Sequence, residues 1–160
     1  MDFAPVLDVD TCPTNPIIGD RSFHSDPAVV ARLGAAFAGG LQRAGVMACG
    51  KHFPGHGDTT LDSHLDLPVV DLPRSRLESV ELAPYRGLRA STCAAVMTAH
   101  VVYPGLDGAR PATLSRTIVT GLLRDAGAGL KNLQQQPLSM EDVFIYRITT
   151  LEAQPGDVPS

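Results

Sequence analysis

The stretch ACGKHFPGHGDTTLDSH, residues 48–64, decides how this chain can fold and where its chemistry lies. A short apolar run, residues 46–49, leads into it and predicts a buried strand over residues 46–50. Three glycines and Pro54 then prevent a continuous helix, so the strand must open into a long polar loop. Loops held by a rigid scaffold commonly carry function, and this one contains three of the five histidines.

Asp62 and His64 are the catalytic candidates of this loop. Histidine has an unperturbed pKa near physiological pH, which suits it to proton transfer. A carboxylate bonded to one ring nitrogen fixes the tautomer and raises the basicity of the other nitrogen. In extended or turn backbone, residues two apart lie on one side. The spacing therefore predicts a dyad in which His64 moves the proton and Asp62 orients it, while Lys51 and His52 offer hydrogen bonds to a polar substrate.

Two other interpretations of the loop stay open. A loop aspartate next to a serine often serves only as a turn cap. His52, His56 and His64 could instead bind zinc together, although their spacing matches no common zinc signature and no cysteine pair accompanies them. A histidine-cluster metal-binding module is therefore an alternative function.

The string KHFPGHGDTTLDSHLDLP, residues 51–68, resembles the signature loop of glycoside hydrolase family 3, in its bacterial β-N-acetylglucosaminidase (β-hexosaminidase) branch. The string is long and highly specific. The resemblance implies that His64 is the general acid/base and is paired with Asp62, where most glycosidases use a carboxylic acid. It also implies that Lys51 and His52 bind the sugar.

Two further segments resemble the same family. The loop NPIIGDRSF, residues 15–23, implies that Arg21 contacts the sugar. Taken alone, Arg21 could be a clamp on a neighbouring aspartate or a fork that binds a ligand. In MTAHVVYPGLD, residues 97–107, His100 follows an apolar run, and it could be a site residue or a hydrogen-bonded core histidine.

The chain alternates between strand and helix patterns, which indicates βαβ units, a parallel sheet and an α/β fold. Further strands are expected over residues 3–10 and 94–101, and residues 68–73 are expected to be extended. Helices are expected from Ser25-Asp26-Pro27 to about Gly45, over residues 74–89 with a kink at Pro84, and over residues 118–123 after a cap at residues 111–115.

The family's domain is a (β/α)8 TIM barrel, a fold of about 250 residues, and this chain has about three βα units. We therefore expect an incomplete barrel, with residues 1–127 as a partial catalytic domain and residues 128–160 as an unrelated linker and tail. A retaining glycosidase also needs a carboxylate nucleophile. In the family it lies in an S-D-D motif on the next strand, where this chain reads DAGAGLKNLQQQ over residues 125–136. The nucleophile is therefore missing from the expected place, and Ser139-Met140-Glu141-Asp142 is only a superficial match.

The composition fits one globular domain, with 160 residues, 44% hydrophobic residues and a formal net charge of −4. The mild acidity argues against nucleic acid as a partner. Three widely spaced cysteines favour the reducing cytoplasm, and no apolar run is long enough to span a membrane.

The resemblance implies an O-glycosyl hydrolase, a retaining β-N-acetylhexosaminidase of peptidoglycan recycling that needs no cofactor. Its expected partner is a small carbohydrate, an N-acetylglucosamine-containing muropeptide or a chitooligosaccharide. Because the nucleophile is missing, we expect this chain to be a truncated form with weak or no activity, made of a gene fragment joined to foreign sequence. A non-catalytic sugar-binding or remnant protein is the alternative.

Overall fold

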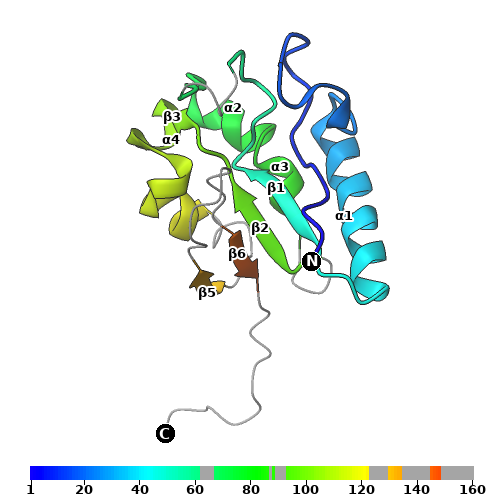
Figure 1. The fold of residues 1–160 in the computed structure, drawn as a ribbon. Coiled ribbons are helices and arrows are strands. Elements are labelled where there is room, and N and C mark those ends of the chain that lie inside the picture. Colours follow the sequence, from blue (N-terminus) through cyan, green and yellow to red (C-terminus); the bar gives the residue numbers. More distant parts are fainter. Residues whose placement is uncertain (62–66, 87, 89–92, 123–129, 135–144, 149–160) are drawn as a thin grey trace, which may run out of the picture.

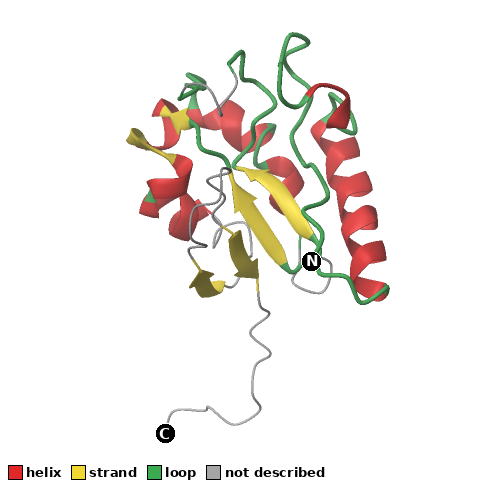
Figure 2. Ribbon diagram, in the orientation of Figure 1, coloured by secondary structure: helices red, strands yellow, loops and turns green. Residues whose placement is uncertain are grey.

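The computed structural model describes residues 1–61, 67–86, 88, 93–122, 130–134 and 145–148. Strands lie at the centre, and helices flank them (Figures 1 and 2). The elements, in chain order, are η1 (Gly19–Arg21), α1 (Pro27–Arg43), β1 (Cys49–Phe53), α2 (Arg74–Ser79), α3 (Ala83–Arg86), β2 (Ala95–Thr98), β3 (Val102–Tyr103), α4 (Pro104–Asp107), β4 (Gly108–Pro111), η2 (Ala112–Leu114), η3 (Thr117–Leu122), β5 (Leu130–Gln134) and β6 (Ile145–Ile148).

The first part of the chain forms the parallel arrangement that its sequence predicts. β1 pairs in parallel with β2, and Cys49 lies opposite Ala95. On the other side of β1, residues 2–7 run parallel to it through isolated bridges, one of which joins Val6 to Lys51. The extended segment around Val69 also forms a parallel bridge, with Val102. The α/β class with parallel strands is therefore confirmed, and the described residues form part of a barrel-type sheet rather than a closed barrel.

Helix α1 begins where the sequence places its start. The Asp26 carboxylate accepts a hydrogen bond from the Ala28 N–H at 2.8 Å, and Pro27 occupies the first turn. The helix ends at Ala44 and Gly45, and Gly45 adopts a φ of 78°, which favours glycine. These local signals explain why this helix was predictable.

Two other elements differ from their predictions, and one predicted cap agrees. β1 begins later than residue 46 and continues to Phe53, so Lys51 and His52 lie within the strand rather than after it. The single kinked helix over residues 74–89 is wrong, because α2 and α3 are separate and Pro84 stands in the first turn of α3, where a missing N–H costs little. Ser115 does cap the next helical turn, since its Oγ accepts the Ile118 N–H at 3.1 Å.

The segment after residue 127 contains strands where a linker was expected. β6 pairs with β2 in the antiparallel sense, and β5 pairs antiparallel with β6, which gives the sheet order β1-β2-β6-β5. The linker interpretation of Gln134 is therefore wrong, because this residue lies in β5. The sheet also departs from an all-parallel barrel at β6. The match at residues 139–142 lies outside the described residues.

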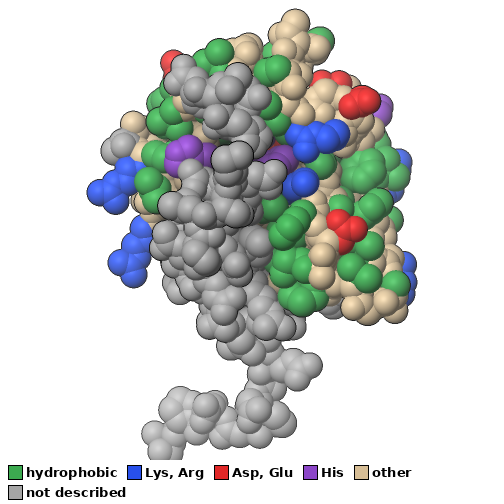
Figure 3. Space-filling view, viewed as in Figure 1, with side chains coloured by type: hydrophobic (Ala, Val, Ile, Leu, Met, Phe, Trp, Pro, Cys, Tyr) green, Lys and Arg blue, Asp and Glu red, His purple; other side chains and the backbone are tan. Residues whose placement is uncertain are grey.

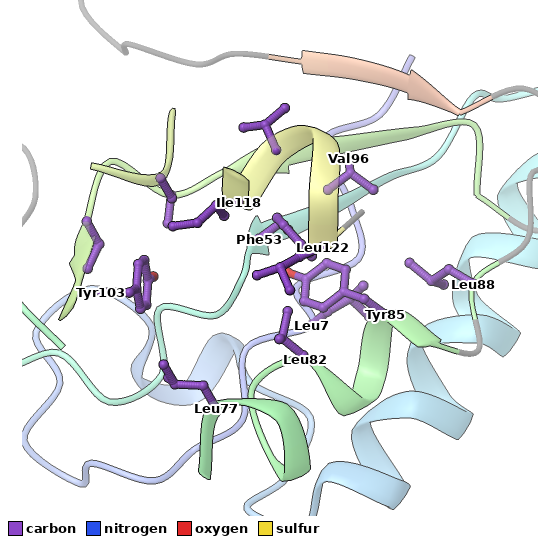
Figure 4. Packing of buried hydrophobic residues seen from close by; sticks show 14 of the residues in the cluster. Leu7, Phe53, Leu77, Leu82, Tyr85, Leu88, Val96, Tyr103, Ile118 and Leu122 are labelled. Atoms are coloured by element: carbon purple, nitrogen blue, oxygen red, sulfur yellow. The ribbon is translucent and has the colours of Figure 1, made fainter. Parts of the chain in front are cut away.

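Buried apolar side chains from the N-terminal segment, both parallel strands and the flanking helices meet in one core (Figure 4). At its centre the rings of Phe53 and Tyr85 are in edge contact, with centroids 5.0 Å apart. Burying a side chain of this size contributes about 1.5–3 kcal/mol, so Phe53 fixes the end of β1 firmly. The half-buried Lys51 and His52 precede Phe53 directly and are positioned by it.

Candidate functional site

The ends of neighbouring parallel segments bring polar side chains to one edge of the sheet. Lys51 and His52 lie at the carboxyl end of β1, and His100 lies two residues beyond the end of β2. Asp8 follows the N-terminal segment that pairs with β1 at Lys51. Figure 3 shows histidine, lysine and arginine side chains on one face of the molecule. This edge is where parallel α/β folds place their binding and catalytic residues.

Asp8 is the buried centre of this edge. Its Oδ2 lies 2.7 Å from His52 Nδ1, and its Oδ1 accepts the backbone N–H groups of His52 and His56 at 3.2 and 2.6 Å. Burial alone would raise the pKa of this carboxyl, but the His52 ring and the N–H donors outweigh burial and hold the pKa below its ordinary value. Asp8 is therefore an ionised acceptor that holds both the His52 side chain and the loop that follows it.

His56 is buried in the loop and points to Thr59. Its Nδ1 lies 2.7 Å from Thr59 Oγ1. Burial is the main reason that its pKa is lowered, although the Asp8 carboxylate acts in the opposite direction. The Asn15 amide donates to the carbonyl oxygens of His56 and Gly57 at 2.8 and 3.0 Å, and its Oδ1 accepts two backbone N–H groups of its own loop. Asn15 thus joins the first loop to the signature loop.

Two more contacts fix the loop. The buried Tyr103 hydroxyl donates to the Gly55 carbonyl oxygen at 2.6 Å. Gly57 approaches the backbone of Val9 so closely that an added Cβ would lie 1.8 Å from the Val9 carbonyl oxygen. Residues 53–59 are consequently held by contacts from several other segments and form one wall of the site.

Arg21 lies in the loop beside this wall. Its Nε and Nη2 donate to the Ile17 carbonyl oxygen at 3.1 and 2.6 Å, and the side chain is exposed. In the described part of the chain it makes no ion pair with an aspartate, so the clamp that it forms is on a backbone carbonyl. Its positive charge helps to lower the pKa of His56, after burial and the His52 ring, so Arg21 acts on a residue of the site.

His100 is half-buried and bonds to a neighbouring hydroxyl. Its Nδ1 lies 2.6 Å from Thr113 Oγ1. One ring nitrogen therefore has a partner within the protein. This agrees both with a site residue and with a hydrogen-bonded core histidine. Its role stays a prediction.

The predicted dyad, Asp62 and His64, lies outside the described residues. The zinc alternative needs His64 as well as His52 and His56. Its three ligands are therefore not all among the described residues. Within the residues that the structure describes, no group of three or more His, Cys, Asp or Glu side chains is arranged to hold a metal ion.

Sequence reasoning missed the residues that hold the site together: Asp8, Asn15, Thr59 and Tyr103. Asp8 had a local signal, because an acidic residue inside the apolar run VLDVD is unusual for a buried strand. Asn15, Thr59 and Tyr103 stand in the three strings that resemble the family, but those strings do not indicate which partners they bind. The other three act through partners more than 40 residues away or through loop geometry. Such contacts leave no local pattern.

Parallel strands flanked by helices, with lysine and histidine side chains at their carboxyl edge, are typical of a (β/α)8-barrel enzyme fold. The chain belongs to glycosyl hydrolase family 3, because it matches the family's N-terminal domain over residues 1–131. The family expected from the signature loop is therefore confirmed. The match ends close to residue 127, where we expect the domain to end.

Proteins of known function and structure agree with this assignment. A β-hexosaminidase from Neisseria meningitidis serogroup C is 48% identical over 126 residues, covering 78% of this chain and 34% of that protein. β-Hexosaminidase A from Pseudoalteromonas piscicida is 44% identical over 136 residues, covering 78% of this chain and 23% of the relative.

Among solved structures, a family 3 β-N-acetylglucosaminidase from Paenibacillus sp. str. FPU-7 is 51% identical with a TM-score of 0.75, covering 78% of this chain and 24% of its own. The chain thus spans no more than about a third of the length of these relatives.

Proposed function

We propose that this chain carries part of the active site of a retaining β-N-acetylhexosaminidase, which removes terminal β-linked N-acetylglucosamine. The observation that carries the proposal is the pair Lys51 and His52 at the carboxyl end of β1, with the His52 ring held by Asp8. Relatives that are 44–48% identical are β-hexosaminidases, which supports the same reaction class.

In the proposed mechanism, the residues at the strand edge bind the sugar and the dyad moves the proton. Lys51 and His52 hydrogen-bond to sugar hydroxyls, and Arg21 approaches from the first loop. His64 protonates the leaving oxygen while a carboxylate from outside the described residues bonds to the anomeric carbon. His64 then activates the water that releases the sugar from this carboxylate, and Asp62 orients His64. The signature loop supports this assignment, since its anchored part, residues 53–59, leads directly into the dyad.

The natural substrate that we propose is a muropeptide or a chitooligosaccharide with a terminal N-acetylglucosamine, processed in the cytoplasm during peptidoglycan turnover. The relatives' names support the sugar but not the aglycone. In the described part of the chain, no helix is long and apolar enough to cross a membrane.

The test is release of nitrophenol from 4-nitrophenyl N-acetyl-β-glucosaminide by the purified chain and by His64→Ala. Turnover that the variant loses would support an assembled site. Turnover that the variant keeps would refute the dyad. No turnover in either would mean that the chain by itself is not a hydrolase, and the proposal would then apply only to sugar binding.

Sugar binding without catalysis is the second candidate, and isothermal titration with N-acetylglucosamine tests it. His52→Ala removes a proposed sugar contact, while the exposed His24, whose Nδ1 only accepts the Asp26 N–H, provides a matched control in His24→Ala. Binding that His52→Ala weakens and His24→Ala does not is expected. Equal binding by all three proteins would refute the sugar-binding assignment.

A further inference from the structure

We propose that Asp8 is a positioning residue that fixes His52 in the Nδ1–H tautomer and thereby presents Nε2 as a hydrogen-bond acceptor to the ligand. The tautomer itself follows from geometry alone. Only the role of Nε2 toward a sugar rests on the proposed function.

The state of the Asp8 carboxylate decides where the hydrogen of its contact with His52 lies. The carboxylate is completely buried and accepts two backbone N–H groups through Oδ1, so it is held as an anion with no proton to donate. An ionised carboxylate can only accept. The 2.7 Å contact between Oδ2 and His52 Nδ1 therefore requires the hydrogen to lie on Nδ1.

The other ring nitrogen of His52, Nε2, is then the one that can accept a hydrogen bond. A neutral imidazole with a hydrogen on Nδ1 has a lone pair on Nε2. The structure describes no partner for Nε2, and 16% of the His52 side chain is exposed, so a ligand can reach the ring at the sheet edge. The group that fits this nitrogen is a hydrogen-bond donor, such as a hydroxyl or an amide N–H of a sugar.

Asp8→Asn separates this role from simple structural support. Asp8 also anchors the loop through Oδ1, which accepts the His56 N–H at 2.6 Å. In Asp8→Asn, the amide oxygen can keep the Oδ1 bonds, while the amide N–H₂ faces His52 Nδ1 as a donor. The substitution therefore keeps the hydrogen bonds that anchor the loop. It also requires the His52 hydrogen to lie on Nε2 instead of Nδ1.

The experiment is a two-bond ¹H–¹⁵N correlation spectrum of the histidine rings in the ¹⁵N-labelled full chain at about pH 8, where free imidazole is neutral. His52→Gln identifies the His52 signals by their absence. We expect at least about a tenfold excess of the Nδ1–H tautomer in the unaltered protein, since bonds to charged acceptors are the strong ones. We expect Asp8→Asn to reverse that preference while the His56 signals stay unchanged.

Thr59→Val is the matched control, because it removes the partner of His56 Nδ1 and leaves Asp8 and His52 in place. It should change the His56 signals and leave those of His52 unaltered. An Nε2–H tautomer in the unaltered protein, a doubly protonated His52 ring at this pH, or a tautomer that Asp8→Asn leaves unchanged would each overturn the proposal.

Titration with N-acetylglucosamine distinguishes this proposal from the proposed function. About a tenfold weaker affinity in Asp8→Asn than in the unaltered chain is expected if Nε2 accepts from the sugar. Absence of binding by the unaltered chain would refute the sugar-binding role, and the ring spectra would still decide the tautomer.

Discussion

Replacement of Gly57 by alanine tests whether the signature loop is held as tightly as its contacts indicate. An added Cβ would lie 1.8 Å from the carbonyl oxygen of Val9, whereas real contacts of this kind almost never fall below 3.0 Å. Both residues are buried, and the atom approached belongs to the backbone. The two segments would therefore have to separate by about 1.2 Å.

That separation breaks the bonds that Asn15 makes to the loop. Its amide lies 2.8 and 3.0 Å from the carbonyl oxygens of His56 and Gly57, and a shift of this size takes both beyond hydrogen-bond range. A buried polar group left without a partner costs about 1–3 kcal/mol. Two such groups cost about 2–6 kcal/mol together. Alanine restricts the unfolded chain and offsets at most about 1 kcal/mol, so we expect Gly57→Ala to lower the free energy of unfolding by about 1–5 kcal/mol.

Urea unfolding followed by far-UV circular dichroism measures this change, since the chain has no tryptophan for fluorescence. Gly40→Ala is the matched control, because Gly40 lies inside α1 and an added Cβ would meet nothing closer than Arg43 Nη2 at 4.0 Å. In the control, the higher helix propensity of alanine should raise the free energy of unfolding by about 0.5–1 kcal/mol. A Gly57→Ala protein within about 0.5 kcal/mol of the unaltered chain would show that the loop is not held by these contacts.

Three further predictions concern charge and the sheet edge. Because the folded pKa of Asp8 lies below its ordinary 3.8, its stabilising contribution is complete above that pH and is lost as the pH falls through the lower folded value. Asp8→Asn should therefore lose less unfolding free energy than the unaltered chain between about pH 5 and pH 2 in urea titrations; parallel curves would contradict this. Arg76→Gln leaves the buried Glu81 without its 2.7 Å partner and should cost about 3 kcal/mol at neutral pH. Burial raises the pKa of Glu81 above 4.5 despite Arg76, so the cost should shrink as the pH is lowered toward that value, and a pH-independent cost would refute the reasoning. Deletion of residues 128–160 removes β5 and β6, which leaves the edge of β2 open, and light scattering should detect more self-association; an unchanged monomer would instead support an unrelated tail.

Local signals in the sequence predicted the first half of the fold well. The cap at Asp26 and Pro27 and the stop at Gly45 act within one or two turns of α1, so the chain itself carries the information. The alternation of apolar runs and helices was enough for the parallel pairing of β1 and β2. The antiparallel pairing of β6 with β2 was not predictable, because it joins residues about 50 positions apart and depends on which sheet edge is available.

The candidate site, like the fold, could be predicted only in part from the sequence. The signature string identifies Lys51 and His52, and the strand that carries them places both at the sheet edge. It does not identify Asp8, which lies 44 residues before His52 and meets it only because the N-terminal segment and β1 are parallel. The motif thus indicates the groups that we propose to contact a ligand, whereas the group that orients His52 is found only from the fold.

The position of Asp8 also bears on the nucleophile, for which residues 125–136 offer no S-D-D motif. A retaining glycosidase needs a carboxylate that is free to attack the anomeric carbon. Asp8 is near the proposed sugar contacts, but it is completely buried and accepts from His52 Nδ1 and two backbone N–H groups. A completely buried carboxylate lacks the access that attack requires, and three hydrogen bonds already occupy most of its about four lone-pair sites. Turnover that persists in Asp8→Asn would therefore place the nucleophile outside the described residues or on a second chain. Turnover abolished in Asp8→Asn, with the His52 tautomer unchanged, would make Asp8 itself the nucleophile and would refute its positioning role.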